Sequence, residues 1–405
     1  MDIQNKLFDL EGTIQPYQWG GFTYIPTLLS REVKAGQPSA EYWLGAHVQA
    51  PSIVNGEVKL DALLQQHPQL LGAAVQSKFG RLPYLLKVLD VKDMLSIQVH
   101  PTRQSAVEGY AAENAAGVAL SASNRNYKDD NHKPELAFTL SEFWLLHGFR
   151  EPGSLKEVLA ERAELQFLLE VFEEGEYAKL YRTVMEMQDE EVGARLLPLL
   201  DRILPEYEAG RLLKSNPDFW AARAAITYNS PGRIDRGIFS IYLLNLVEMK
   251  KGQAIFQDAG VLHAYLEGQN VEIMANSDNV LRGGLTPKHV DVPELMKHVR
   301  FVPCIPQLLP ATDVQPFEKA FVTPAEDFEL HLLELPAKAA LELHTATTDI
   351  LLVMEGTLDI TETGTGFKLT QSRGESVLLT AGATVKISTA GGCQAFRATV
   401  PAAAK

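Results

Sequence analysis

The sequence predicts a mainly β protein that is interrupted by one α-helical insertion. Residues 1–150 and 231–305 alternate short apolar runs with turn residues, which is typical of β-strands. Residues 151–230 instead place apolar residues at helical spacing, and residues 306–405 return to short strands between glycine-containing turns. A chain of 405 residues exceeds what one hydrophobic core usually organises, so two or three compact units are expected.

The first β unit is read from strands and turns on both sides of the insertion. A turn at 81–83 precedes an apolar run at 84–88, and a Lys-Lys-Gly turn at 250–252 separates predicted strands at 245–249 and 253–257. The sequence pattern typical of β-strands therefore stops before the insertion and resumes after it. Residues 1–150 and 231–305 are assigned to one discontinuous unit.

The helical insertion is predicted to open at residues 154–157, where Ser-Leu-Lys-Glu has the form of a capping box. The spacing of the apolar residues that follow favours an amphipathic helix, and helical spacing continues through the charged stretch 177–204. No chemical motif occurs in this insertion. The spaced apolar residues are Leu155, Val158, Leu159, Leu165, Leu168, Leu169 and Phe172.

Residues 306–405 predict a separate small β-barrel or sandwich. Strands are expected at 350–355 and 375–380, between turns that contain glycine. Gly356 and Gly374 have a strand-turn-strand spacing similar to that around residue 252. This similarity suggests two related barrels.

Composition and charge exclude several classes of function. With 46% hydrophobic and 22% charged residues, the chain has the composition of an ordinary soluble globular protein. The net charge of −14 opposes binding to nucleic acid or anionic membranes, so an anionic substrate must meet a local basic patch. No signal peptide and no membrane-spanning run is recognised, and Cys304 and Cys393 lack zinc-knuckle spacing. A cytoplasmic location is expected, and the oligomeric state is left open, a monomer included.

Three segments carry candidate metal ligands. In the strictly alternating segment 96–101, Gln98 and His100 share one face of a strand, where they could bind one ion or form a hydrogen-bonded pair. In the segment 131–136, His132, Lys133 and Glu135 crowd around a proline and could equally form a solvated loop. His263 lies in an apolar run, where a histidine is often a satisfied core residue.

Together these segments offer a mixed ligand set for a divalent cation. Two imidazoles, one carboxylate and one amide suit zinc, and the lack of a cysteine ligand favours a catalytic site with an open position. The candidate ligands are Gln98, His100, Glu135 and His263.

The polar segment 271–288 offers a candidate phosphate site. Arg282 and Lys288 could hold a phosphate, although a surface loop with ordinary charges is the alternative. Neither a P-loop nor a dinucleotide-binding glycine fingerprint occurs here. The phosphate would therefore belong to the substrate and not to a bound nucleotide.

Seven ordered motifs make the sequence resemble the type I mannose-6-phosphate isomerases across nearly the whole chain. The last of them is long and highly specific. The motifs are YQWG at 17–20, EYWLGAH at 41–47, LLKVLD at 85–90, SIQVHP at 96–101, NHKPE at 131–135, LHAYLEG at 262–268 and MANSDNVLRGGLTPK at 274–288.

The resemblance implies a cupin-type jelly-roll catalytic domain, a helical domain at 151–230 and a second cupin-like β-barrel at 306–405. It implies that one zinc ion is held by Gln98, His100, Glu135 and His263, and that Arg282 is catalytic. Residues that fall in or beside the same motifs are assigned to the pocket. They are Trp19, Lys87, His132, Lys133, Tyr265, Glu272, Asp278 and Lys288.

The sequence departs from the family pattern at Val48 and Leu262, where the family often has proline. Both changes are conservative for the metal. The carboxy-terminal unit has His344 but no paired Gln-x-His, so a second metal site is not expected there.

The resemblance implies interconversion of mannose 6-phosphate and fructose 6-phosphate through an enediol, which needs an acid/base, an electrophile and a phosphate anchor. The proton carrier could be Glu272, Lys133 or Asp278, and the sequence does not choose among them. A non-haem iron oxygenase would also use two histidines and a carboxylate, but the amide of Gln98 argues against it. A sugar-binding cupin without catalysis would not need the dense segment 272–288.

Overall fold

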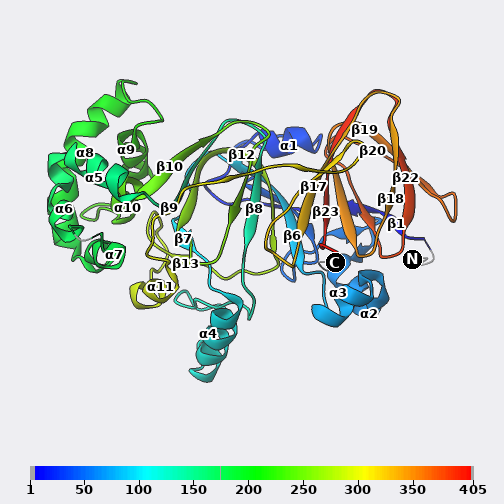
Figure 1. Cartoon of the computed structure of the whole chain (residues 1–405), viewed down its shortest axis with the longest axis horizontal. Helices are drawn as coiled ribbons and strands as arrows, with labels where there is room; N and C mark the ends of the chain where they lie inside the picture. Colours follow the sequence, from blue (N-terminus) through cyan, green and yellow to red (C-terminus); the bar gives the residue numbers. More distant parts are fainter. Residues whose placement is uncertain (1–4, 174, 403–405) are drawn as a thin grey trace.

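The computed structural model describes residues 5–173 and 175–402, and Figure 1 shows their arrangement. Two large antiparallel sheets lie side by side, with a cluster of helices at the outer end of one of them. We call the eleven-stranded sheet the first β unit and the twelve-stranded sheet the second β unit. The prediction of a mainly β protein with a helical insertion is confirmed.

The first β unit is built from strands on both sides of the helical insertion. Among the described residues its strands are β2 (Thr13–Gln15), β3 (Glu41–Gly45), β6 (Tyr84–Val91), β7 (Gln98–Val99), β8 (Glu135–Thr139), β9 (Phe143–Phe149), β10 (Leu244–Met249), β11 (Ala254–Gln257), β12 (His263–Ala275), β13 (Leu281–Arg282) and β14 (Leu308–Leu309).

The long strand β12 organises this unit because it changes partners along its length. Residues 268–275 pair with β6, and much of that stretch pairs with β8 on the other side, whereas residues 263–267 pair with β9 and, at His263, with β7. The change falls at Gly268, whose φ of 125° favours glycine and whose added Cβ would lie 2.5 Å from the Glu142 carbonyl oxygen. This switch brings the start of β12 to the short strand that carries Gln98.

The helical insertion packs its helices around one apolar core. In α7 (Tyr177–Glu186), Tyr177, Leu180, Tyr181 and Val184 recur at helical spacing and are all buried. The other helices of this cluster are α5 (Pro152–Ala160), η2 (Ala163–Leu165), α6 (Phe167–Val171), α8 (Asp189–Glu208), α9 (Pro217–Tyr228) and α10 (Gly237–Leu243).

The start of the insertion differs from the predicted capping box. Helix α5 begins at Pro152, so Ser154 lies inside it, and the preceding Glu151 makes no side-chain capping bond. Proline is favoured in the first turn because its nitrogen needs no partner there, and this fixes the start earlier than Ser154. Helix α10 extends the cluster beyond residue 230, into the region that the sequence assigns to the β unit.

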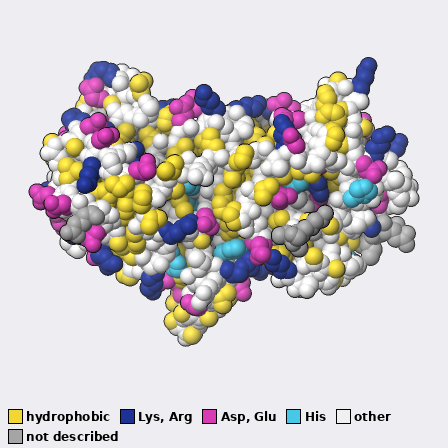
Figure 2. Space-filling model, viewed as in Figure 1, with side chains coloured by type: hydrophobic (Ala, Val, Ile, Leu, Met, Phe, Trp, Pro, Cys, Tyr) yellow, Lys and Arg dark blue, Asp and Glu magenta, His cyan; other side chains and the backbone are white. Residues whose placement is uncertain are grey.

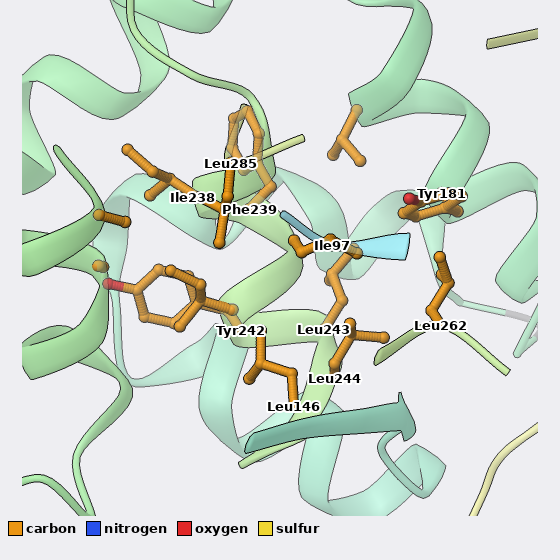
Figure 3. Packing of buried hydrophobic residues seen from close by; sticks show 14 of the residues in the cluster. Ile97, Leu146, Tyr181, Ile238, Phe239, Tyr242, Leu243, Leu244, Leu262 and Leu285 are labelled. Carbon is orange, nitrogen blue, oxygen red and sulfur yellow. The ribbon is translucent and has the colours of Figure 1, made fainter. Parts of the chain in front are cut away.

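The helical core continues into the first β unit (Figure 3). Ile97 and Leu285, which belong to the β unit, lie among Ile238, Phe239 and Tyr181 of the helices. All five side chains are buried. The two parts therefore share one core, and the helices can hold segments of the β unit in place.

The second β unit includes the first strand of the chain. Strand β1 (Leu7–Glu11) pairs with β21 (Ser376–Leu379) and with β4 (Ile53–Val54), which continues to β5 (Val58–Lys59). The sequence assigns these early residues to the first unit, and their pairing places them in the second. Its remaining strands are β15 (Thr312–Gln315), β16 (Glu318–Phe321), β17 (Glu329–Leu335), β18 (Ala340–His344), β19 (Asp349–Glu362), β20 (Lys368–Ser372), β22 (Thr384–Ser388) and β23 (Cys393–Thr399).

The two β units are joined by a shared core and by buried hydrogen bonds. The ring of Phe138 meets Phe321 and Phe396 edge to face, and the hydroxyl of Tyr84 donates toward the carbonyl oxygens of Thr348 and Ala398. Short helices lie near this junction: α1 (Tyr24–Leu28), α2 (Leu60–Gln66), η1 (Pro68–Leu71) and α3 (Ala73–Lys78). Helix α4 (Arg103–Ala115) projects from the first β unit, and α11 (Val292–His298) lies beside α7 and β13.

The outer surface carries mixed charge. On the face shown in Figure 2, basic and acidic side chains are interspersed, so the net negative charge forms no single patch on this face. None of the described helices combines the length and the apolar character that a bilayer crossing needs.

Candidate metal centre

Three buried side chains meet at one edge of the first β unit. His100 follows β7, while Glu135 and His263 are the first residues of β8 and β12. Each is at most 2% exposed, and one ligand atom from each lies within 4.8 Å of the others. The two carboxylate oxygens of Glu135 each lie 3.4 Å from a histidine Nε2 atom. We call these three residues the metal cluster.

The hydrogen bonds of the two imidazoles leave a lone pair free on each ring. Nδ1 of His100 lies 2.8 Å from the carbonyl oxygen of Asn279, and Nδ1 of His263 lies 2.9 Å from that of Val261. Because a carbonyl only accepts, each Nδ1 carries the proton and each Nε2 is an acceptor. Both Nε2 atoms are buried without a hydrogen-bond partner among the described residues. This is the arrangement of metal-ligating histidines.

Electrostatics support the charge states that a metal needs. Burial lowers the pKa of His100 to about 4, so its ring is neutral near pH 7. Burial opposes ionisation of Glu135, but Lys133, whose Nζ lies 2.9 Å from Oε1, holds the pKa of this carboxyl well below its usual range. Two neutral imidazoles and one carboxylate suit zinc.

Gln98 lies beside the metal cluster because of strand register. It is the direct partner of His263 across β7 and β12, and of Arg282 across β7 and β13. Directly paired residues project from the same face of a sheet, and Gln98 lines the pocket described next. The pairing thus puts an amide and a guanidinium on the face that carries His263.

A pocket of about 740 Å³ opens above the metal cluster. Glu135 and Gln98 line it, whereas the fully buried His100 and His263 do not. Most of the pocket residues that the sequence predicts line it as well. They are Trp19, Lys87, Lys133, Tyr265, Glu272, Asp278, Arg282 and Lys288.

Lys87 lies between two buried carboxylates on one side of this pocket. Its Nζ is 3.2 Å from Glu41 and 3.3 Å from Glu272, its direct partner across β6 and β12. Burial opposes the charge of Lys87, but Glu41 and Glu272 raise its pKa above the ordinary value. One ammonium cannot balance two carboxylates, and burial with the nearby charge of Glu135 raises the pKa of Glu272 to about 7.

Tyr265 and Asp278 hold opposite charge states in the same pocket. Burial, with the charge of Glu272, raises the pKa of Tyr265 well above its usual value, so its hydroxyl stays protonated. Burial opposes ionisation of Asp278, but His47, whose Nε2 lies 3.2 Å away, lowers the pKa of the Asp278 carboxyl. Tyr265 is therefore a donor and Asp278 an anion.

Two cations at the pocket lack acidic partners. Within the described residues, no carboxylate lies within 4.0 Å of the side-chain nitrogens of Arg282 or Lys288. Burial lowers the pKa of Arg282, and burial followed by the charge of Arg282 lowers that of Lys288. Unpaired, partly desolvated cations are suited to a dianionic group.

His132 is not brought together with the other predicted residues. It does not line the pocket, and its Nε2 lies 2.7 Å from the buried carboxylate of Asp327 and 2.7 Å from an Arg103 nitrogen. Asp327 belongs to the second β unit, so His132 contributes to the junction between the units. Its predicted role in substrate binding has no support from these contacts.

The pocket also contains residues to which the sequence gave no role. Trp43 donates from Nε1 to Glu41 at 2.6 Å, and both lie in the motif at 41–47, which could have indicated them. Thr227 and Tyr228 come from the end of α9 in the helical insertion. Nothing local in the sequence indicates them, because only tertiary packing brings this helix end to the pocket.

Comparisons with known proteins agree with this geometry. Residues 7–152 match the family model for the catalytic domain of type I phosphomannose isomerase. The chain is 38% identical over 358 residues to mannose-6-phosphate isomerase of Salmonella typhimurium, covering 86% of this chain and 88% of that protein. It is 31% identical over 389 residues to the human mannose-6-phosphate isomerase, covering 87% and 88%.

Solved structures resemble the whole chain. A structure of the Salmonella typhimurium mannose 6-phosphate isomerase bound to substrate, fructose 6-phosphate, and zinc has a TM-score of 0.86. It is 33% identical to this chain, and the match covers 98% of this chain and all of that one. A zinc-bound structure of mannose 6-phosphate isomerase has a TM-score of 0.85 at the same identity and coverage.

Proposed function

The chain belongs to the type I mannose-6-phosphate isomerase family, and on that premise we propose how its pocket interconverts mannose 6-phosphate and fructose 6-phosphate. One observation carries the proposal. The free Nε2 atoms of two buried imidazoles lie close to the Glu135 carboxylate. Glu135 lines a pocket that is also lined by Arg282 and Lys288, two cations without acidic partners. Two members of the ligand set, Gln98 and Glu135, thus line the same cavity as the anion-binding pair.

The metal of this site is zinc. We assign Gln98, His100, Glu135 and His263 as its protein ligands, because the donors are of the right type and the free lone pairs converge. When bound, zinc supplies a Lewis acid that polarises the sugar oxygens at the reacting carbons.

Lys288 and Arg282 divide the recognition of the substrate. Lys288, the more exposed of the two, binds the phosphate as a point charge. Arg282 is strand-paired with Gln98, so we place it nearer the reacting carbons. Its guanidinium there stabilises the negative charge that develops on the enediolate oxygens. Trp19, whose ring stacks with Tyr17 at 6.0 Å, gives the sugar an apolar wall.

Glu272 is the proton carrier that the electrostatics favour. A carboxylate with a pKa of about 7 can both accept the proton from one sugar carbon and return it to the other. Lys133 is paired with Glu135, which we assign to the metal, and His47 lowers the pKa of Asp278, so Asp278 is a weaker base than Glu272. A Glu272 carboxylate oxygen would therefore move the proton between C2 and C1.

We also propose the finer architecture. Each β unit is a cupin-type jelly roll, with the first unit discontinuous around the helices and the second at 306–405 completed by β1, β4 and β5. The cytoplasm remains the proposed location.

The test is an isomerase assay on zinc-loaded protein with mannose 6-phosphate in deuterated water. We expect turnover and solvent deuterium at C1 of the fructose 6-phosphate formed, because the carried proton exchanges. A fully zinc-loaded protein without turnover would refute the function. Turnover with complete transfer of the C2 hydrogen to C1, and no solvent deuterium, would instead contradict a proton carrier that exchanges with solvent.

A further inference from the structure

The buried carboxylate of Asp235 binds the backbone of the loop that carries the two pocket cations. Asp235 lies just before α10 and is 5% exposed. Its Oδ1 accepts from the backbone N–H of Leu285 at 2.8 Å, and its Oδ2 accepts from that of Thr286 at 3.2 Å. Both donors lie between Arg282 and Lys288. The same Oδ1 also accepts from the N–H of Gly237 at 2.8 Å.

The loop needs such a restraint because its backbone conformation is energetically unfavourable at Leu285. Leu285 has a φ of 52°, in the left-handed region that residues with a side chain rarely adopt. Its side chain is completely buried in the shared core, among Ile238 and Phe239 (Figure 3). A conformation of this kind persists only when the surrounding structure imposes it. The hydrogen bonds to Asp235 are part of what imposes it here.

Backbone packing fixes the same contact from both sides. A Cβ added to Gly284 would lie 2.5 Å from the Cα of Gly237, and a Cβ added to Gly237 would lie 2.5 Å from the nitrogen of Leu285. On its other side the loop pairs with Ile97, which precedes Gln98: the N–H of Gly283 donates to its carbonyl at 2.7 Å, and its N–H donates to Gly284 at 3.0 Å. The loop is thus clamped between the metal-ligand strand and the start of α10.

We infer that Asp235 is a positioning residue for the isomerase reaction, which holds Arg282 and Lys288 in place through the backbone of Leu285 and Thr286. This inference rests on the proposed function. Asp235 does not itself line the pocket or belong to the metal cluster, and no cation lies within 4.0 Å of its carboxylate among the described residues. Its carboxylate is satisfied by backbone N–H donors, so its contribution is the geometry of the loop.

An amide at this position tests the inference with little change in volume. In Asp235→Asn one oxygen becomes an NH₂ group, so either Leu285 or Thr286 loses its acceptor. We expect kcat to fall about 10- to 100-fold, as a displacement of roughly 1 Å in a catalytic group can produce. Zinc content should be unchanged. The control is Asp189→Asn, which removes an acid that pairs with Arg236 near the same loop but does not contact residues 285 and 286; its kcat should match that of the wild type.

A double variant separates positioning from general destabilisation. If Asp235 acts through Arg282, adding Asp235→Asn to Arg282→Ala should cost little further kcat, whereas independent effects would multiply. Should Asp235→Asn fail to fold, Gly237→Ala displaces the same loop by the Cβ contact described above and should give the same loss of kcat.

Amide hydrogen exchange gives a readout that does not depend on activity. In the zinc-loaded protein, peptides covering residues 280–290 should exchange faster in Asp235→Asn than in the wild type, and elsewhere exchange should be alike. A wild type that does not isomerise would refute the proposed function while this measurement still tests the restraint. Unchanged kcat in a folded Asp235→Asn protein, multiplied losses in the double variant, or unchanged exchange at 280–290 would overturn the inference.

Discussion

The metal cluster and the loop at 282–288 face one pocket but are held in different ways. The residues of the cluster start or directly follow strands, and the Nδ1 atoms of its two histidines bond to nearby carbonyl groups. The loop instead depends on a left-handed Leu285 and on a carboxylate some 50 residues earlier in the chain. Strand register therefore positions the metal, whereas a long-range restraint positions the cations. The predictions that follow probe this difference.

Loss of a metal ligand should have the largest effect. His100→Ala should remove zinc and lower turnover by about 10³-fold or more, since a Lewis acid contributes several kcal/mol to transition-state stabilisation. Metal analysis and an isomerase assay check this. His344→Ala, which removes an exposed histidine paired with Glu342, should keep both zinc and activity. Full zinc occupancy in His100→Ala would contradict the ligand assignment.

Glu272→Gln tests the proton carrier on the strand that also begins with His263. We expect a loss of about 10²- to 10⁴-fold in kcat, the range for general acid–base groups, with zinc retained. Because the base must be ionised, kcat/KM of the wild type should fall as the pH drops through the pKa of Glu272. That pKa is about 7 without metal and lower beside a bound dication.

The pH profile of the variant completes this test. Glu272→Gln should lack the acidic limb that the wild type shows. An identical limb in both proteins would assign the titration to another group and reopen the choice of Lys133 or Asp278.

Within the loop, Arg282→Ala and Lys288→Ala should change different kinetic constants. Removal of Arg282 should lower kcat about 10²- to 10³-fold, because its interaction strengthens in the transition state. Arg282→Lys should rescue poorly, since an ammonium lacks the planar fork. Lys288→Ala should act mainly on KM. Near-native kcat in a folded, zinc-loaded Arg282→Ala protein would make Arg282 an anchor only.

The cysteines should give the smallest effect, since neither lies in the metal cluster or the loop. Burial raises the pKa of Cys304 and raises that of Cys393 to about 11, so both are poor nucleophiles near pH 7. A Cys304→Ser/Cys393→Ser protein should retain kcat and zinc, with a small loss of thermal stability from the buried hydroxyl at 393. Loss of turnover in a folded, zinc-loaded double variant would contradict this.

The sequence predicted the residues of the metal cluster, whose positions follow local strand patterns, better than the residues that depend on long-range contacts. Alternation in segment 96–101 predicted that Gln98 and His100 share a face, and the candidate ligands lie where local strand patterns begin or end. His132 could not be placed this way, because its partner Asp327 is 195 residues away in the second β unit. Asp235 was missed because it acts on backbone N–H groups, which no side-chain motif records.

The fold shows the same limit at its boundaries. The alternating and apolar patterns located β6, β10 and β11 to within a few residues. The assignment of β1 required knowledge of its partner β21, and nothing in residues 7–11 indicates which sheet they join. Local patterns predict which residues form strands, but the choice of partner depends on the whole chain.

The pairing of β1 with β21 has a consequence for synthesis of the chain. Ser376 Oγ donates to the carbonyl of Leu10 across 366 residues, so the second sheet cannot close until the end of the chain has left the ribosome. Until then β1 exposes an unpaired apolar edge that could pair with another nascent chain. Truncation before β21 should therefore reduce the yield of soluble protein, even though the metal ligands and the loop are all present.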